Sequence, residues 1–315
     1  MTAAGAARKL DDHLWVLDTY HQGQPGVVAS YLLDGPHGLG LVDVGSGATV
    51  ENLLAGVRSA GFDPAQIVRI LLTHIHLDHA GATGALVNAL PNAQVYVHRL
   101  GAPHLIDPTR LVRSATRIYG EQMPSLWGEI VPVPQERLHV VDDGDKIAVG
   151  PSELRVLYTP GHAVHHIAFV DEWRKLLFPG DVAGVRLEAP PLVRPPTPPP
   201  DLNLEDWYAS LDRVLTLRPQ RLLLPHFGPV NEVEVHITEL RERLLAWGDL
   251  ALEGMRASLD AESIAKAFSG SDLDRLTDLR DTAAARRYEL AANYLMSAQG
   301  YVRYFQTQHP ELLIC

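Results

Sequence analysis

Leu-Leu-Thr-His-Ile-His-Leu-Asp-His-Ala-Gly-Ala-Thr-Gly, residues 71–84, is the stretch of this sequence that decides its fold. An apolar run over residues 67–72 predicts a buried strand, and helical spacing begins at Ala80. Four side chains of metal-binding type lie between the strand and the helix: His74, His76, Asp78 and His79. Imidazoles and a carboxylate suit zinc, iron or manganese. Because α/β sheets place their sites where strands end in loops, the spacing predicts a metal site here.

The same layout, a strand that ends in a metal-binding side chain, recurs three times later in the sequence. The residues concerned are His162, after the predicted strand 153–158, Asp181, after a predicted hairpin over 167–178, and His226, after the apolar run 222–224. The alternative interpretation is a chance clustering of surface or core histidines. The repetition at four strand ends weighs against that alternative and favours metal binding.

Two further features near the predicted site have more than one interpretation. Asp43 ends a predicted strand and precedes Gly-Ser-Gly. It either accepts a hydrogen bond that orients a metal-bound histidine or caps the turn and the helix predicted over 49–60. His165 and His166 follow His162 closely, and on a strand they would point to opposite faces. Each is a candidate for substrate contact, and a structural role is equally compatible with their positions.

Composition and charge exclude several classes of protein. The 315 residues are 46% hydrophobic and 21% charged, as in a folded globular chain. The net charge of −11 argues against electrostatic binding of large nucleic acids or anionic membranes by the chain as a whole. Neither residues 1–12 nor any other segment has the apolar run of a signal peptide or a membrane span. The one cysteine, Cys315, leaves no disulfide within the chain and no nearby thiolate ligand, so we expect a cytoplasmic protein.

A proline-rich segment and a change in periodicity divide the chain. Residues 1–230 form the predicted catalytic domain, and residues 231–315 have helical spacing without a strand pattern. The segment 188–202 contains seven prolines, which favour an extended, stiff connector beside the predicted cleft. Aromatic residues at helical spacing are typical of helix packing or of a subunit contact, which leaves a homodimer open: Tyr288, Tyr294, Tyr301, Tyr304 and Phe305.

In order along the chain, these motifs resemble those of the metallo-β-lactamase-fold hydrolase superfamily over roughly residues 10–230. The His-x-His-x-Asp-His signature is followed by the family's Gly-His, Gly-Asp and single-histidine motifs. The resemblance implies an α+β protein, a four-layer αββα sandwich, here with a C-terminal all-helical appendage. It also implies two divalent metal ions, most simply zinc, with iron or manganese as alternatives. The implied ligands are His74, His76 and His162 for one ion and Asp78, His79 and His226 for the other, with Asp181 as the bridge.

The resemblance implies a hydrolase that cleaves a small ester, thioester or lactone. Two adjacent dications make hydroxide available near pH 7, and a hydroxide that bridges them would attack the carbonyl carbon. Asp78 would orient the water and shuttle a proton. The signature is similar to that of glyoxalase II, the thioesterase for hydroxyacylglutathione, and of the quorum-quenching lactonases. We therefore expect a small-molecule substrate.

Other branches of the superfamily define the alternatives. A persulfide dioxygenase would use a single iron held by His74, His162 and Asp181, whereas a complete second ligand set favours the dinuclear hydrolase. A small phosphodiesterase is compatible with the signature, while the acidic balance argues against large nucleic acids. Many zinc β-lactamases have a cysteine where Asp181 stands, so that activity is disfavoured. A non-catalytic binding protein would lack one or more ligands, and none is missing.

Overall fold

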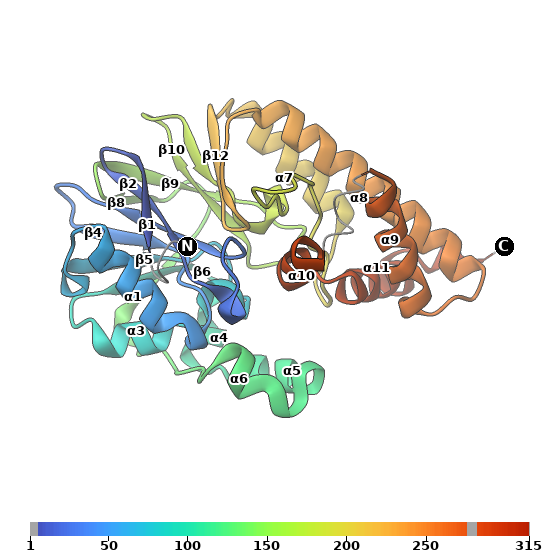
Figure 1. The fold of residues 1–315 in the computed structure, drawn as a ribbon, viewed down its shortest axis with the longest axis horizontal. Helices are drawn as coiled ribbons and strands as arrows, with labels where there is room; N and C mark the ends of the chain where they lie inside the picture. The colour runs from blue at the N-terminus through green and yellow to red at the C-terminus, as the bar shows by residue number, and fades with distance from the viewer. Residues whose placement is uncertain (1–5, 276–281, 315) are drawn as a thin grey trace. The chain divides into compact units, whose positions relative to one another are not determined.

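The computed structural model describes residues 6–275 and 282–314, and the chain forms two compact units (Figure 1). The first unit comprises Met1–Tyr158 and His165–Gly180, and the second comprises Thr159–Val164 and Asp181–Cys315. Cys315, on which the expectations about disulfides and thiolate ligands rest, lies outside the described residues. The domain boundary at residue 230 stays a prediction.

A seven-stranded sheet forms the centre of the first unit. Its order is β1-β2-β3-β4-β5-β6-β7, antiparallel up to β4 and parallel from β4 to β7. Its strands are Ala7–Asp11 (β1), Leu14–Asp18 (β2), Ala29–Leu33 (β3), Leu39–Val42 (β4), Ile67–Leu71 (β5), Gln94–His98 (β6) and Leu138–Val141 (β7). Because β4 and β5 are parallel, with Val42 opposite Leu71, the residues that follow both strands lie at the same edge.

Four more strands of the first unit pair in an antiparallel manner in the order β8-β9-β10-β11. They are Lys146–Val149 (β8), Ser152–Tyr158 (β9), Ile167–Asp171 (β10) and Leu176–Phe178 (β11). The side chains of β10 and β11 are all buried. The first unit therefore contains strands of two sheets, as the αββα prediction requires.

Helices pack on the seven-stranded sheet because their apolar residues recur every three or four positions. The helices of the first unit are Val50–Ser59 (α1), Leu77–Ala80 (α2), Thr83–Ala89 (α3), Ala102–Ile106 (α4), Thr109–Tyr119 (α5) and Met123–Trp127 (α6). Leu53 and Val57 of α1 and Leu86 of α3 join one buried cluster with the strands. The sequence pattern of residues 101–130 predicts an irregular, mainly helical insertion, and helices α4 to α6 confirm it.

The second unit is mainly helical. Its helices are Leu204–Thr216 (α7), Val233–Arg256 (α8), Ala261–Arg275 (α9), Thr282–Ala291 (α10) and Tyr294–Gln308 (α11), and a hairpin joins Arg221–Leu224 (β12) to Gly228–Val230 (β13). The sequence has helical spacing over residues 282–305, and the structure divides this stretch into two helices. The division falls at Asn293, whose side chain accepts from the Met296 N–H at 2.9 Å and caps a new helix. Among the described residues, no helix combines the length and the apolar character that spanning a membrane requires.

The aromatic residues of the helical region form its core. The ring centroids of Trp247 and Phe268 are 4.4 Å apart with planes 6° apart, and Tyr301 packs edge-on against Phe268. Tyr288 and Tyr301 are fully buried within the unit. The aromatic spacing in the sequence thus reflects packing between α8, α9 and α11.

Apolar runs in the sequence predict strands over residues 14–18, 27–33, 39–44, 67–72, 94–98, 153–158, 167–170, 173–178 and 222–224. Four of the strands described above have no counterpart in that set: β1, β7, β8 and β13. β1, Ala-Arg-Lys-Leu-Asp, is an edge strand whose side chains are half-buried or exposed, so it shows no apolar alternation. β13 has three residues, Gly-Pro-Val, and pairs with β12 through its backbone. Pairing of this kind leaves little trace in the side chains, which is why the sequence pattern misses it.

Candidate metal centre

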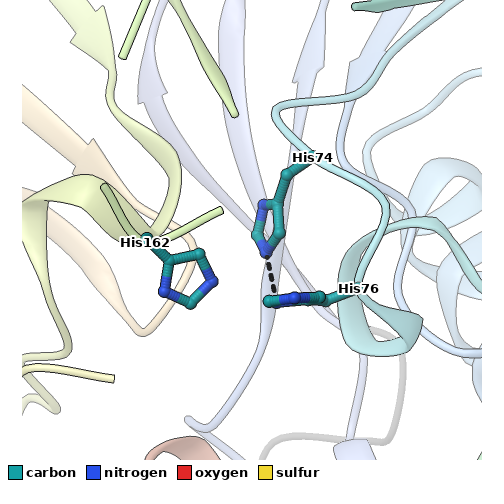
Figure 2. A group of neighbouring side chains, drawn as sticks. All are labelled: His74, His76 and His162. Carbon is teal, nitrogen blue, oxygen red and sulfur yellow. Dashed lines mark hydrogen bonds between the residues drawn. The ribbon is translucent and has the colours of Figure 1, made fainter. Parts of the chain in front are cut away.

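The loop after β5 carries His74 and His76, and the short helix α2 that follows carries Asp78 and His79, so this first set of predicted ligands lies within the first unit. Nε2 of His74 lies 3.1 Å from Nδ1 of His76, with the two ring planes 80° apart (Figure 2). The ring centroid of His79 is 4.1 Å from that of His74, and Nε2 of His79 is 3.5 Å from Oδ2 of Asp78. The structure thus brings together the four residues of the signature.

Asp43 is the acceptor that orients this set. It directly follows β4, is 2% exposed, and accepts hydrogen bonds from the Thr73 N–H at 2.8 Å and from Nδ1 of His79 at 3.0 Å. The Thr73 hydroxyl donates to the same carboxylate at 2.8 Å, so its oxygen accepts from Nδ1 of His74 at 3.0 Å. Since a carboxylate only accepts, both imidazoles carry their proton on Nδ1 and keep a lone pair on Nε2. Of the two interpretations of Asp43, the geometry supports the orienting role.

His162, of the second unit, is held by a tight turn and a backbone carbonyl. Gly161 has φ +128°, and a Cβ there would overlap with Cα of Trp207 in α7, so glycine is required. The His162 ring packs edge-on against Trp207 at 5.6 Å, and its Nδ1 donates to the Pro196 carbonyl at 2.8 Å. The carbonyl cannot donate, so Nε2 of His162 (labelled in Figure 2) carries the lone pair.

Asp181 faces two histidines of the second unit with different oxygens. Oδ2 is 3.5 Å from Nε2 of His162, and Oδ1 is 3.5 Å from Nε2 of His226. This separation exceeds that of an ordinary N–H···O hydrogen bond. It matches the spacing of about 3.4 Å between two ligands of one tetrahedral ion with bonds near 2.1 Å. The three residues are buried, and each histidine has its own carboxylate oxygen.

The donor chemistry of these residues fits a divalent metal. Groups of histidine and aspartate side chains that could hold a metal ion are present among the described residues. At His74, His79 and His162 a partner fixes the proton on Nδ1, which is the arrangement that metal-ligating histidines require. Imidazole and carboxylate donors accept zinc, iron or manganese.

His236 of α8 supports the segment that follows Asp181, and sequence reasoning missed it. Its Nε2 donates to the Ala183 carbonyl at 2.7 Å, while the Trp207 indole donates to the Val182 carbonyl at 2.7 Å. Burial lowers the pKa of His236 to about 4, although the hydrogen bond to Ala183 acts in the opposite direction. A histidine on the apolar face of the predicted helix, between Val233 and Leu240, is the signal that could have indicated this contact.

We expect acid to destabilise the protein through His236. The unfolded chain has the ordinary pKa of 6.5, so between pH 6.5 and 4 it binds a proton that the folded protein does not bind. The free energy of unfolding therefore falls as the pH drops, by about 2 kcal/mol between pH 7 and pH 5. His236→Gln keeps an N–H donor but has no group that titrates in this range. In urea unfolding of the metal-free proteins, the free energy of unfolding of the variant should therefore fall by about 2 kcal/mol less between pH 7 and pH 5 than that of the wild type. An equal loss in both proteins would contradict the assignment.

His165 and His166 lie in the turn before β10 and not on a strand, so the alternation of faces expected for a strand does not apply to them. Both are buried, and their ring centroids are 6.2 Å and 5.1 Å from that of His74. Burial, with the nearby His76 next in effect, lowers the pKa of His165 well below its ordinary range, so its imidazole is neutral. Nδ1 of His165 has no hydrogen-bond partner among the described residues, which leaves it open to another molecule.

The family model described as Metallo-beta-lactamase superfamily matches residues 23–226, and the chain therefore belongs to that superfamily. A metallo-beta-lactamase fold-containing protein of Sulfurisphaera tokodaii is 30% identical over 177 residues, 54% of this chain and 65% of that protein. A hydroxyacylglutathione hydrolase of Bdellovibrio bacteriovorus is 28% identical over 162 residues, 50% of this chain and 47% of that protein. The solved structure of a metallo-beta-lactamase family protein from Thermus thermophilus has 27% identity and a TM-score of 0.64, covering 89% of this chain and 88% of that one.

Membership of this superfamily confirms several predictions. The α+β fold of two sheets with a C-terminal helical region is that of the similar solved structures. The enzyme class is confirmed as well, since superfamily members such as hydroxyacylglutathione hydrolase are metal-dependent hydrolases. The chain spans 65% of the Sulfurisphaera protein and 47% of the Bdellovibrio protein, so the likeness to these relatives fixes neither its substrate nor the number of metal ions.

Proposed function

We propose that the protein hydrolyses a small ester, thioester or lactone with two divalent metal ions, most simply zinc. The observation that carries the proposal is Asp181, whose two carboxylate oxygens each face Nε2 of a different histidine at 3.5 Å. A carboxylate that serves two ions has this arrangement. Following the family resemblance, we assign His74, His76 and His162 to one ion and Asp78, His79 and His226 to the other, with Asp181 shared.

The protein residues supply orientation and proton transfer in this reaction. Bound metal ions supply Lewis acidity and lower the pKa of water, so that hydroxide is available near neutral pH. Asp43 holds His79 directly and His74 through Thr73, which fixes the lone pairs before any ligand binds. Asp78 is 18% exposed, unlike the fully buried His79, so it can reach both water and substrate and move a proton.

Two observations support the proposed substrate class: the neutral imidazole of His165 and the name of one relative. His165 offers a neutral imidazole nitrogen without a partner among the described residues, which suits a hydrogen bond to a carbonyl or leaving-group atom. The name of the Bdellovibrio relative states hydrolysis of hydroxyacylglutathione, a thioester. We therefore place thioesters first and oxygen esters and lactones next.

The experiment that tests the proposal combines metal content with a substrate panel. Protein purified without added metal should contain about two metal ions per chain and hydrolyse a member of a thioester, ester, lactone and phosphodiester panel. His226→Ala and Asp78→Ala should each lower turnover by at least about 100-fold and reduce the bound metal. His139→Ala, on the exposed face of β7, is the matched control and should leave both unchanged.

The same measurements separate this proposal from the dioxygenase alternative. The dinuclear hydrolase would be contradicted by three results together: a single iron per chain, oxygen consumption with a persulfide, and little effect of His226→Ala on turnover. Turnover confined to a phosphodiester would keep the two ions and replace the substrate class.

A further inference from the structure

The proline-rich segment 188–202 is fastened to the C-terminal helices at three points, all within the second unit. The first point is Tyr288 of α10, whose side chain is fully buried. Its hydroxyl accepts from the Leu192 N–H at 2.8 Å and donates to the Pro190 carbonyl at 2.7 Å. Within the segment, the Leu192 N–H also reaches the Pro190 carbonyl at 3.0 Å. Because proline-rich backbone makes no regular internal hydrogen bonds, the Tyr288 hydroxyl adds partners that join the segment to α10.

The second point is Arg194, a charged residue that is 1% exposed. Its Nε donates to Oδ2 of Asp272 in α9 at 3.0 Å, and its Nη1 donates to the Ala292 carbonyl at 3.1 Å. The guanidinium also lies 4.0 Å from the ring centroid of Tyr294 in α11. A buried guanidinium is stable only with such partners, so the position of Arg194 is fixed by the C-terminal helices.

The third point is the close approach of Thr197 to α11. A Cβ added to Gly300 would overlap with the Thr197 carbonyl oxygen, closer than any Cβ contact allows. The Thr197 hydroxyl donates to the Ser297 carbonyl at 3.3 Å, one helical turn earlier. The helix and the segment therefore touch backbone to backbone, and any side chain at position 300 would displace the segment.

Pro196 lies between the second and third points, and its carbonyl is the one that accepts from Nδ1 of His162. We propose that the C-terminal helices position this histidine: they hold the segment, the segment aims the Pro196 carbonyl, and the carbonyl fixes the tautomer and the orientation of the His162 ring. The inference rests on the proposed role of His162 as a metal ligand. It gives the helical region a part in metal binding through residues that do not touch the metal.

The chemistry of residues 195 and 196 suits this role. Proline restricts φ to about −65°, so two successive prolines limit how far the Pro196 carbonyl can turn. Pro196 also has no N–H, which leaves the carbonyl as its one backbone hydrogen-bonding group. A shift of the anchored residues on either side is therefore transmitted to the hydrogen bond with His162.

Two pairs of matched variants test the inference. Gly300→Ala pushes on Thr197, whereas Gly248→Ala in α8 meets its nearest neighbour, Tyr301, at an ordinary 3.5 Å. Tyr288→Phe removes the hydroxyl that holds the segment, whereas Tyr301→Phe removes one that donates to the Leu244 carbonyl between two helices. In each pair the same group is added or removed in the helical region, a methyl group in the first pair and a hydroxyl in the second. The control members, Gly248→Ala and Tyr301→Phe, do not change a contact with the segment 188–202.

The readout is zinc affinity of the full-length metal-free protein, measured by competition with a chromophoric chelator. Gly300→Ala and Tyr288→Phe should weaken binding of one zinc ion about 10-fold, the usual cost of losing a partner behind a metal-bound histidine. The visible spectrum of the cobalt-loaded protein should change in the same two variants, because it reports ligand geometry. Thermal unfolding of the metal-free proteins shows whether a variant has lost stability instead.

His162→Ala separates the possible failures. Weakened zinc binding in His162→Ala, with wild-type affinity and cobalt spectra in both Gly300→Ala and Tyr288→Phe, would overturn the positioning role alone. Unchanged zinc binding in His162→Ala would overturn the ligand assignment, and the positioning role with it. Equal weakening in the control variants would also overturn it, since any disturbance of the helices would then suffice.

Discussion

Asp43→Asn is expected to weaken metal binding about 10- to 100-fold while the protein stays folded. The amide has the shape of the carboxylate, and asparagine tolerates the left-handed φ of +53° found at this position. However, its NH₂ group must face either Nδ1–H of His79 or the Thr73 N–H, both of which are donors. With the NH₂ group toward His79, the ring avoids a clash only by moving its proton to Nε2, the atom that would bind the metal. With the NH₂ group toward Thr73, the backbone N–H that anchors the loop loses its acceptor.

Metal content after dialysis and zinc competition measure this effect, with melting temperature as the check on folding. Asp63→Asn is the matched control, because the Asp63 carboxylate also accepts from a backbone N–H, that of Ala65 at 3.0 Å, and is exposed. Full metal occupancy in Asp43→Asn would show that Asp43 stabilises the loop and does not orient its histidines.

Asp272→Ala is expected to lower the free energy of unfolding by about 3–5 kcal/mol. Asp272 is fully buried and accepts from Arg194 at 3.0 Å and from the Tyr294 hydroxyl at 2.6 Å, and it also pairs with Arg243. Without the carboxylate, Arg194 keeps Glu289 at 3.4 Å, but two buried guanidiniums lose the negative charge that they share. The loss of a shared counter-charge in a desolvated site is the reason for the large effect.

Urea unfolding of the metal-free protein measures the change in stability. Asp212→Ala removes a carboxylate that accepts from Arg241 at 2.6 Å but whose side chain is 63% exposed. It should cost less than about 1 kcal/mol, since exposed ion pairs contribute little. A cost for Asp272→Ala that is no larger than for Asp212→Ala would mean that water reaches the two arginines.

Short-range pattern predicted much of the fold. Residues 14–18 and 94–98 form the strands expected for them, because both alternate or bury apolar side chains at strand spacing. The four signature residues come together because six consecutive positions after β5 cannot separate far. His165 and His166 were placed less well, since the strand rule does not apply in a turn.

Long-range partners could not be predicted from the sequence. Asp43 and His79 are 36 positions apart, and Arg194 and Asp272 are 78 apart, so no periodicity connects them. The sequence around Arg194 does not show whether its side chain is buried or exposed. Every residue has a backbone carbonyl, so the sequence gives no indication that the carbonyl of Pro196 accepts a hydrogen bond from His162.

The buried pair of Arg194 and Asp272 also limits how this chain can be recombined with its relatives. The proline-rich segment and the helical region lie on opposite sides of residue 230, yet each contributes one charge of the pair. A chimera that joins residues 1–230 to the C-terminal helices of another superfamily member keeps the Arg194 guanidinium, which then depends on a carboxylate from those helices at the position of Asp272. Moving the segment 188–202 together with residues 231–315 keeps both charges of the pair in one piece.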